Sequence, residues 1–325
     1  MPDADEPLPP RAGAPTGSVK APSSLLTVKE LDQSIGVMPA LATPLKQDGS
    51  VDEAGIKRLV EHVLAGGVHG LLPLGSTGEN ASLDEPTRHR VLECVVRAAA
   101  GRVPVLCGVA QPNLPQARAE VAAAAKLGAD AALVPPPFYY LTDQATVLAF
   151  YRRLKADSPL PILVYNIPPL TKIVAEPATI ATLAREGTIA GIKDSSRDFE
   201  YFQSMRIATR DIDGFLVYTG SDTMLIGSMA MGGTGTICGA ANVAPAWVVE
   251  IYNAMKRGDL DAARPVQDRL IELVAALRAG VFPSSIKAAL HLQGICEPWL
   301  APPTAPLAED AMARMRGRLD AWGLL

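Results

Sequence analysis

Short apolar runs recur along this chain from residue 37 onward, and each is followed by a longer amphipathic stretch. The runs are rich in valine, isoleucine and leucine, and they are apolar at successive positions rather than at every second one. Continuous hydrophobicity over this length is typical of strands that are buried on both faces of a parallel sheet. The pattern predicts eight strands, at residues 37–42, 70–75, 103–109, 130–135, 161–167, 188–193, 215–219 and 234–239.

The stretches between these runs have the spacing and the end signals of helices. In residues 53–65 apolar side chains recur every three or four positions, and Asp52 can cap the first turn. Residues 87–100 and 115–127 repeat this design, and a glycine follows each of the three stretches. Eight alternating strand and helix units predict an α/β protein with the (β/α)8 fold, the TIM barrel.

The chain of 325 residues is longer than the predicted barrel and extends past it at both ends. Residues 1–34 are rich in proline, small residues and acidic residues, which is typical of a disordered arm. We expect the barrel to occupy residues 35–258. Residues 259–325 would then form a C-terminal helical cap, with amphipathic stretches at 259–279, 284–293 and 307–321.

Composition narrows the classes of function. Hydrophobic residues make up 48% of the chain and the formal net charge is −4, so the chain has neither the composition of a disordered protein nor the basic surplus of a nucleic-acid-binding protein. The run 223–249 carries no charge, but its glycines and Pro245 favour a buried strand and turns over a membrane span. Four widely spaced cysteines fit a reducing compartment, and we predict a cytoplasmic location.

The barrel prediction places candidate chemistry at the C-terminal ends of the strands. Hydroxyl groups, tyrosines and one lysine converge there, and no cluster of histidine and carboxylate residues with metal-ligand spacing accompanies them, so we predict no metal site. The residues at or just after the predicted strand ends include Thr43, Ser76, Thr77, Tyr139, Tyr140, Tyr165, Asn166, Lys193, Ser195 and Asp222.

Lys193 is the candidate nucleophile, because an amine at the inner end of an apolar strand is partly desolvated. Desolvation lowers the pKa of an amine and leaves it able to attack a carbonyl carbon. The alternative is a structural lysine that reaches solvent or pairs with Asp194. Tyr165 ends the preceding strand and could transfer protons in imine chemistry; the alternative is a core tyrosine.

Residues 75–79, Gly-Ser-Thr-Gly-Glu, form a glycine-flanked turn at the end of the second predicted strand. Successive backbone N–H groups in such a turn can bind a carboxylate or a phosphate. The spacing is not that of a P-loop, and the glycines of 232–239 do not form a dinucleotide-binding fingerprint. A plain tight turn is the alternative interpretation.

Five motifs in order resemble one family. GSTGE (75–79), PFYY (137–140), YNIP (165–168), GIKDSS (191–196) and GGTGTI (232–237) are similar to those of the dihydrodipicolinate synthase/N-acetylneuraminate lyase family of pyruvate-dependent class I aldolases. The resemblance extends from about residue 35 to the C-terminus. It implies a Schiff-base-forming lyase, an aldolase or a dehydratase, that needs no metal and no organic cofactor.

The resemblance also implies roles for individual residues. Lys193 would form the Schiff base with pyruvate or another 2-oxo acid, and Tyr165 would shuttle protons. Ser76 would connect Tyr165 to Tyr139 of a neighbouring subunit, with Tyr140 as the alternative tyrosine. Ser76 and Thr77 would hold the substrate carboxylate, and the Ile237 backbone would line the pocket. The family is typically a homotetramer, a dimer of dimers.

Some positions depart from the named members of the family. Leu170 stands where the lysine-pathway synthases carry an arginine that grips a substrate carboxylate, and leucine cannot replace its guanidinium. Thr223 and Gly239 replace two polyol contacts of the sialic acid lyases. Residues 193–196, Lys-Asp-Ser-Ser, look more like those of the aldolases and dehydratases for 2-keto-3-deoxy sugar acids or for 4-hydroxy-2-oxoglutarate. The polar residues Ser195, Ser196, Asp222 and Thr223 suit the hydroxylated tail of such a 4-hydroxy-2-oxo or 2-keto-3-deoxy acid. Two alternative functions remain. One is that of 4-hydroxy-tetrahydrodipicolinate synthase, whose substrates are pyruvate and aspartate semialdehyde, and the other is that of a non-catalytic barrel that binds a keto acid.

Overall fold

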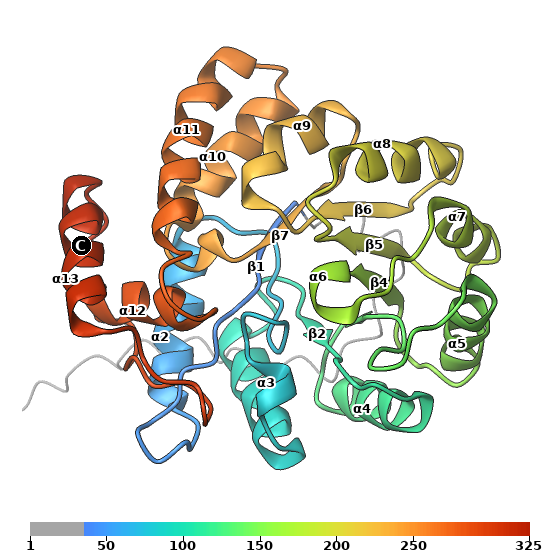
Figure 1. The fold of residues 1–325 in the computed structure, drawn as a ribbon, viewed down its shortest axis with the longest axis horizontal. Helices are drawn as coiled ribbons and strands as arrows, with labels where there is room; N and C mark the ends of the chain where they lie inside the picture. The colour runs from blue at the N-terminus through green and yellow to red at the C-terminus, as the bar shows by residue number, and fades with distance from the viewer. Residues whose placement is uncertain (1–35) are drawn as a thin grey trace, which may run out of the picture.

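A computed structural model describes residues 36–325, which form a parallel β-barrel surrounded by helices (Figure 1). Within these residues seven strands pair in the order β1-β7-β6-β5-β4-β3-β2, and all six pairings are parallel. The strands are β1 (Val37–Pro39), β2 (Leu106–Gly108), β3 (Ala131–Val134), β4 (Ile162–Asn166), β5 (Gly191–Asp194), β6 (Leu216–Thr219) and β7 (Gly235–Cys238).

The segment predicted as the second strand occupies the remaining place in the barrel but pairs less regularly. Leu72 bridges to Ala40 beside β1, and Leu71 bridges to Val105 beside β2, both in the parallel sense. Pro73 has no N–H to donate, and Leu74 turns into the left-handed region at φ 60°. The bridges therefore stop after Leu72, although the Pro73 carbonyl still accepts the Gly108 N–H of β2 at 3.0 Å and the segment closes the barrel as expected.

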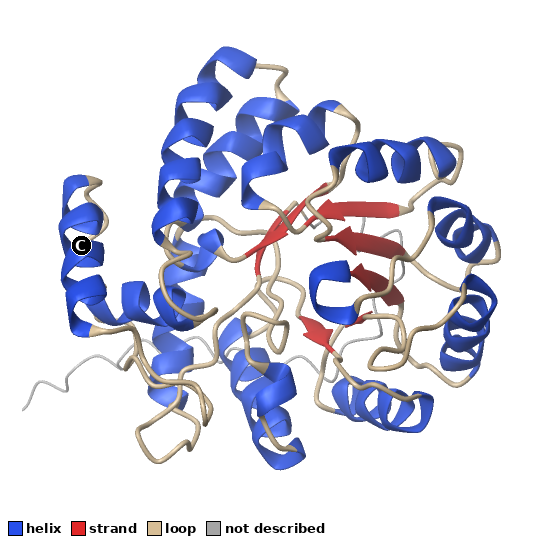
Figure 2. Cartoon of the chain, viewed as in Figure 1, coloured by secondary structure: helices blue, strands red, loops and turns tan. Residues whose placement is uncertain are grey.

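Helices follow the barrel strands and cover their outer faces (Figure 2). The prediction for 53–65 agrees with α2 (Glu53–Ala65), whose cap Asp52 accepts a hydrogen bond from the Gly55 N–H at 2.9 Å. The other helices around the barrel are α3 (Glu85–Ala99), α4 (Leu114–Lys126), α5 (Gln144–Ala156), α6 (Pro168–Thr171), α7 (Pro177–Arg185), α8 (Phe199–Ala208), α9 (Leu225–Ala230) and α10 (Pro245–Lys256), with short 3-10 turns η1 (Asn80–Ser82), η2 (Asp222–Met224) and η3 (Ala240–Asn242).

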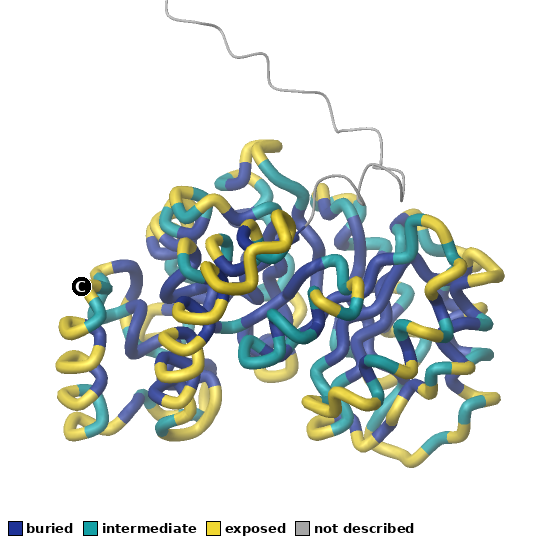
Figure 3. The backbone as a smooth tube through the Cα atoms, turned by 90° about the horizontal axis from the view of Figure 1, so that it is seen from above, coloured by how far each residue is buried: buried dark blue, intermediate teal, exposed yellow. Residues whose placement is uncertain are grey.

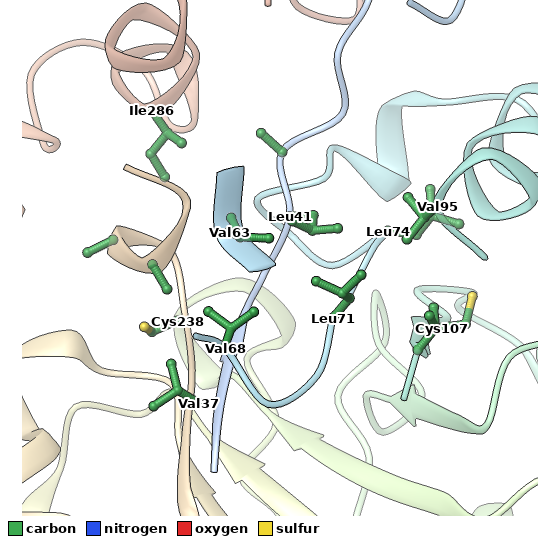
Figure 4. Close-up of a cluster of buried hydrophobic side chains, with 14 of the residues drawn as sticks. Val37, Leu41, Val63, Val68, Leu71, Leu74, Val95, Cys107, Cys238 and Ile286 are labelled. Atoms are coloured by element: carbon green, nitrogen blue, oxygen red, sulfur yellow. The ribbon is translucent and has the colours of Figure 1, made fainter. Parts of the chain in front are cut away.

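Two apolar layers stabilise the barrel. The larger lies between strands and helices, where Val63 of α2 and Val95 of α3 pack with Leu71 and Cys107 of the barrel wall (Figure 4). The smaller fills the barrel interior with inward-facing side chains. Buried residues accordingly form the centre of the molecule, and exposed residues lie on its outer helices and loops (Figure 3). The interior layer consists of Met38, Ala40, Leu72, Leu106, Ala131, Leu133, Leu163, Tyr165, Ala190, Leu216, Tyr218 and Ile237.

The C-terminal part of the described chain is helical, as the periodicity predicts. It contains α11 (Leu260–Ala276), which packs along α10, and then α12 (Ser284–Leu292) and α13 (Glu309–Ala321). The predicted disordered arm, 1–34, lies outside the described residues. The division of the chain into an arm, a barrel and a helical cap stays a prediction.

Candidate active site

Two side chains from neighbouring strands meet at the C-terminal end of the barrel interior. Tyr165 on β4 and Lys193 on β5 are direct partners in the strand register, so their side chains lie on the same face of the sheet. The Nζ atom of Lys193 lies 4.3 Å from the centroid of the Tyr165 ring. Only 3% of Lys193 and 8% of Tyr165 is exposed. The barrel thus holds an amine beside a phenol and shields both from solvent.

The turn at residues 75–79 brings a hydroxyl group to this pair. Ser76 Oγ lies 3.3 Å from the Tyr165 hydroxyl, at hydrogen-bond distance. The N–H groups of Gly78 and Glu79 donate within the turn at 3.0 and 3.2 Å. The N–H groups of Ser76 and Thr77 make no hydrogen bond to any described residue. Two adjacent unpaired N–H donors are what an anion-binding turn provides.

Close backbone packing holds the turn in place. A Cβ atom on Gly78 would lie 2.8 Å from the Leu74 nitrogen and 2.9 Å from the Leu41 oxygen, and one on Gly108 would lie 2.2 Å from the Leu74 oxygen. Only glycine permits backbone approaches this close. The Thr43 hydroxyl donates to the Gly78 carbonyl at 2.7 Å. Gly78 of the turn and Gly108 of β2 therefore have a packing function, and Thr43 supports the turn.

A buried ion pair ties the turn to the C-terminal helices. Glu79 Oε1 lies 2.7 Å from Nζ of Lys287 on α12, and both side chains are buried. The Ala301 N–H donates to the other Glu79 oxygen at 2.7 Å, and Lys287 also donates to the Trp299 carbonyl. Burial lowers the pKa of Lys287, and the Glu79 carboxylate opposes that shift. Residues far along the chain thus hold the turn that Ser76 and Thr77 belong to.

On the other side of Lys193, two backbone segments approach closely. The Ser195 N–H donates to the Asn166 carbonyl at 2.8 Å, and the Gly220 N–H donates to the Asp194 carbonyl at 2.6 Å. A Cβ atom on Gly220 would lie 2.0 Å from Ser195 Oγ and 2.9 Å from Lys193 Cε. Gly220 therefore leaves the space that these two side chains occupy.

Asp194 follows Lys193 on β5 but belongs to a different network. Successive side chains of a strand point to opposite faces, so Asp194 faces away from the barrel interior. Its carboxylate accepts hydrogen bonds from Asn166 Nδ2 at 2.8 Å and from the Ser196 N–H and hydroxyl at 3.1 and 3.0 Å. Burial raises the pKa of Asp194. Asp194 therefore links β4 to β5 and does not pair with Lys193.

Asp222 is the one acidic residue among the described residues that line the cavity with Lys193. Its Oδ1 atom accepts a hydrogen bond from the Ala240 N–H at 2.9 Å, and its carbonyl accepts one from Gln267 of α11 at 3.0 Å. These bonds place Asp222 at the junction of the strand ends and the C-terminal helices. The Asp222 carboxylate also interacts with the buried thiol of Cys238, whose pKa it helps to raise together with burial.

A cavity of about 390 Å³ unites most of the predicted residues. Lys193, Tyr165, Ser76, Thr77, Ser195, Asp222 and Ile237 all line it, as the barrel prediction requires. The wall also includes residues that the sequence analysis did not single out as site residues, namely Arg197, Arg278, Phe282 and Ile286. Arg197 lies two positions after Ser195, so its place in the motif could have indicated it. The other three come from the C-terminal region, and no pattern in the sequence points them to a barrel end.

Tyr139 does not join the other predicted residues within a single chain. It is 84% exposed, and its φ of 87° is a conformation that residues other than glycine rarely adopt. Its ring contacts Tyr140 edge to face, with centroids 5.1 Å apart. Tyr140 and Leu141 are also exposed. An exposed apolar segment of this kind is typical of a contact surface.

Residues 36–325 contain neither a cluster of metal-ligating side chains nor a membrane-spanning helix. No group of three or more histidine, cysteine, aspartate or glutamate residues there could hold a metal ion. No helix there is long and apolar enough to cross a membrane. All four cysteines are buried free thiols.

A parallel barrel with a shielded lysine beside a tyrosine, at the strand ends where a cavity opens, defines the class of lysine-dependent barrel lyases. Comparison with known proteins then assigns the family. Residues 33–321 match the model of the dihydrodipicolinate synthetase family, and the chain belongs to this family. It is therefore an enzyme, a class I lyase that acts through a lysine Schiff base, and the non-catalytic alternative is not supported.

Similar proteins cover nearly the whole chain. A protein of Phenylobacterium zucineum, named 4-hydroxy-tetrahydrodipicolinate synthase, is 39% identical over 290 residues, which is 89% of this chain and 98% of that protein. An uncharacterized DapA-like lyase of Halobacterium salinarum is 37% identical over 290 residues, 89% of this chain and 94% of its own.

Solved structures agree with the fold. Dihydrodipicolinate synthase from Thermotoga maritima is 32% identical with a TM-score of 0.86, covering 90% of this chain and 99% of its own. A prophage protein of the dihydrodipicolinic acid synthase family from E. coli K12, solved in complex with pyruvate, is 29% identical with a TM-score of 0.86 and the same coverage. The barrel with its C-terminal helices is thus the fold of the family.

Proposed function

We propose that Lys193 forms a Schiff base with the keto carbon of a 2-oxo acid, with pyruvate as the three-carbon unit. The observation that carries this proposal is the shielded Lys193 amine, 4.3 Å from the centre of the Tyr165 ring in the wall of the cavity. The complex of an E. coli relative with pyruvate supports the choice of ligand.

The chemistry follows from the amine. The neutral Lys193 nitrogen adds to the keto carbon, and loss of water from this adduct gives a protonated imine. In the cleavage direction the electrons of the C3–C4 bond move into the imine, which leaves an enamine and releases an aldehyde. Protonation of the enamine carbon and hydrolysis of the imine then release pyruvate and free Lys193. The synthetic direction reverses these steps.

The residues around Lys193 supply the proton transfers and the anion site. Tyr165 gives a proton to the oxygen that leaves as water and takes one from the C4 hydroxyl during cleavage. Ser76, 3.3 Å from the Tyr165 hydroxyl, holds that phenol in position and connects it to the next donor. The unpaired N–H groups of Ser76 and Thr77 bind the substrate carboxylate.

We further propose that Tyr139 reaches the active site of a neighbouring subunit and that the enzyme is a homotetramer. The exposure of Tyr139 and its positive φ support this assignment, because a single chain gives the residue no contact that explains its conformation. Mixing inactive Lys193→Ala and Tyr139→Phe chains tests it. Restored activity in the mixed oligomer is the expected result, and inactive mixtures of proven hetero-oligomers would rule it out.

The substrate that best fits the cavity is a 4-hydroxy-2-oxo or 2-keto-3-deoxy acid. Ser195 and Asp222 line the wall and suit a hydroxylated tail. The names of curated relatives favour the alternative, 4-hydroxy-tetrahydrodipicolinate synthase, with pyruvate and aspartate semialdehyde as substrates. Leu170 lines the same cavity, so the arginine that the lysine-pathway synthases carry at this position is missing here. A screen for pyruvate release from these acids, and for pyruvate consumption with aspartate semialdehyde, decides between the two.

Borohydride reduction in the presence of pyruvate tests the Schiff base directly. Reduction should fix one pyruvate-derived mass increase on the peptide that contains Lys193. The Lys193→Ala variant should show none, whereas Lys126→Ala, at an exposed position on α4, should react like the wild type. No adduct, or an adduct on another lysine, would refute the proposal.

We propose a cytoplasmic location for the protein, which four free buried thiols support.

We propose that residues 259–325 act as a cap on the barrel. Ile286 and Arg278 from this region contribute to the cavity wall, and Lys287 forms the buried ion pair with Glu79.

A further inference from the structure

The cavity wall carries two arginines that no described residue pairs with. Arg197 follows β5, Arg278 follows α11, and both line the cavity that contains Lys193. Neither side chain forms an ion pair or a hydrogen bond with another described residue, and both residues are exposed. Many arginines elsewhere on the surface do pair, for example Arg152 with Glu186. The two guanidinium groups at the cavity therefore remain available to a ligand.

The backbone of Arg197 is held in an unusual conformation. Its φ is 63°, in the left-handed region that favours glycine, asparagine and aspartate. Lys172 and Ala100 also have positive φ, but each ends a helix, where this conformation satisfies carbonyl groups. Arg197 precedes the N-cap of α8, and its side chain makes no compensating contact with a described residue. The turn itself is closed by the Asp198 N–H, which donates to the Ser196 hydroxyl at 3.1 Å, but this bond does not involve the Arg197 side chain. A strained residue whose side chain has no structural partner is a candidate for a role in binding.

The charges in the cavity wall are unbalanced. Lys193, Arg197 and Arg278 are basic, and Asp222 is the one acidic residue among the lining residues that the structure describes. Asp222 also receives the Ala240 N–H. Since guanidinium groups pair with carboxylates and phosphates through two parallel hydrogen bonds, the surplus charge suits an anionic ligand.

The anion-binding turn and the arginines have different places in this wall. The N–H donors of Ser76 and Thr77 belong to the turn after the second barrel segment, and they are assigned to the carboxylate next to the keto group. The arginines come from the loops after β5 and α11. A ligand bound covalently to Lys193 would therefore meet a second group of anion donors with the rest of its chain.

We propose that Arg197 and Arg278 bind a second negatively charged group at the far end of the substrate, a carboxylate or a phosphate. This inference rests on the proposed Schiff base at Lys193, and it narrows the substrate to 2-oxo acids that carry two anionic groups. Arg197 and Arg278 thereby determine specificity without taking part in the bond cleavage.

The test compares substrates that differ only at the far end. Pyruvate release is measured with 4-hydroxy-2-oxoglutarate, which has a terminal carboxylate, and with 4-hydroxy-2-oxopentanoate, which has a methyl group there. A second pair compares 2-keto-3-deoxy-6-phosphogluconate with 2-keto-3-deoxygluconate, which lacks only the phosphate. In at least one pair we expect kcat/KM to favour the charged tail by about tenfold or more, which is the contribution of a charged hydrogen bond. The pair with the larger preference identifies the anionic group.

Variants then assign the preference to the two residues. In Arg197→Gly with Arg278→Gln the ratio of kcat/KM for the charged and methyl tails should fall about tenfold, mainly through KM for the charged tail. Glycine adopts the φ of 63° without strain. Arg197→Gly therefore removes the guanidinium and lets the backbone keep its conformation. Arg316→Gln, an exposed and unpaired arginine on α13, should keep the wild-type ratio.

Two results overturn the inference. One is a wild-type enzyme without a preference for a charged tail, and the other is a double variant that loses activity equally on both tails. Borohydride trapping of pyruvate on the wild-type enzyme separates this failure from that of the proposed function, because pyruvate has no far end. Trapping at Lys193 with an unchanged ratio refutes the role of the arginines alone, whereas no trapping refutes the Schiff base.

Discussion

The hydroxyl of Tyr165 lies 3.3 Å from Oγ of Ser76, and this contact joins β4 to a turn that lies 89 residues earlier in the chain. Ser76 has two separate groups: a side-chain hydroxyl near the phenol, and an unpaired backbone N–H that we propose binds the substrate carboxylate. The two roles can be separated by mutation, because alanine removes the hydroxyl and keeps the N–H.

Ser76→Ala should therefore lower kcat more than it changes KM. We expect kcat to fall about 10- to 100-fold, because Tyr165 loses the partner that orients its proton, and KM for the 2-oxo acid to change little. Tyr165→Phe should cost more, about 10²- to 10⁴-fold in kcat. Steady-state kinetics of pyruvate release measure both, with Ser204→Ala on the exposed face of α8 as the control. A rise in KM alone for Ser76→Ala would contradict the positioning role.

Gly220→Ala should impair the enzyme without unfolding it. The added Cβ atom would lie 2.0 Å from Ser195 Oγ and 2.9 Å from Lys193 Cε, so both side chains must move. We expect kcat/KM to fall about 100-fold, the usual effect of displacing a reacting group by about 1 Å. Gly317→Ala is the matched control, because nothing lies within 4 Å of a Cβ atom there and the position is in α13. Equal activity of the two variants would show that the crowding around Lys193 is unimportant.

Breaking the ion pair between Glu79 and Lys287 should destabilise the fold. Lys287→Met leaves a buried carboxylate without its partner, which costs about 3–5 kcal/mol of unfolding free energy. Glu79→Gln in combination with Lys287→Met should recover most of that loss, because the neutral amide oxygen can still accept the Ala301 N–H. Urea unfolding of the two variants and the wild type measures this. If the double variant is no more stable than Lys287→Met, the buried charge is not the cause.

Asp194→Asn should change how stability depends on pH. Burial raises the pKa of Asp194 above its ordinary value of 3.8, so the folded state holds a proton that the unfolded chain has already released. Stability contributed by this group is therefore lost as pH rises from about 4 through the folded-state pKa. Asparagine does not titrate, and its side chain can keep the bonds to Asn166 and Ser196.

The stability of Asp194→Asn relative to wild type should accordingly increase as pH rises above about 4 and level off once the wild-type carboxyl is ionised. Urea unfolding of both proteins between about pH 4 and 8 gives this difference. Asp213→Asn, at an exposed position whose carboxylate pairs with no described residue, controls for the loss of one charge. Parallel pH profiles for wild type and Asp194→Asn would refute the assignment.

The predictions from the sequence succeed where local rules suffice. The strand and helix alternation follows from the period of apolar residues, and α2 begins and ends as its cap residue and its glycines indicate. Lys193 and Tyr165 could be found because parallel strands end at one rim, and that rule needs only the strand positions. The second barrel segment is shorter than predicted, since Pro73 and Leu74 interrupt its pairing.

The barrel, the order of its units and the chemical type of its strand ends can therefore be predicted from the sequence, because they depend on neighbours a few positions apart. The ion pair between Glu79 and Lys287, and the place of Arg197 and Arg278 in one cavity, could not be predicted, because these residues come together through packing of segments distant in sequence. Neither the hydrophobic pattern of the sequence nor the structure of a single chain assigns Tyr139 to a site, since its proposed site belongs to another subunit. A hydrophobic period specifies which face of an element is buried, whereas the partner on that face is chosen by the whole fold.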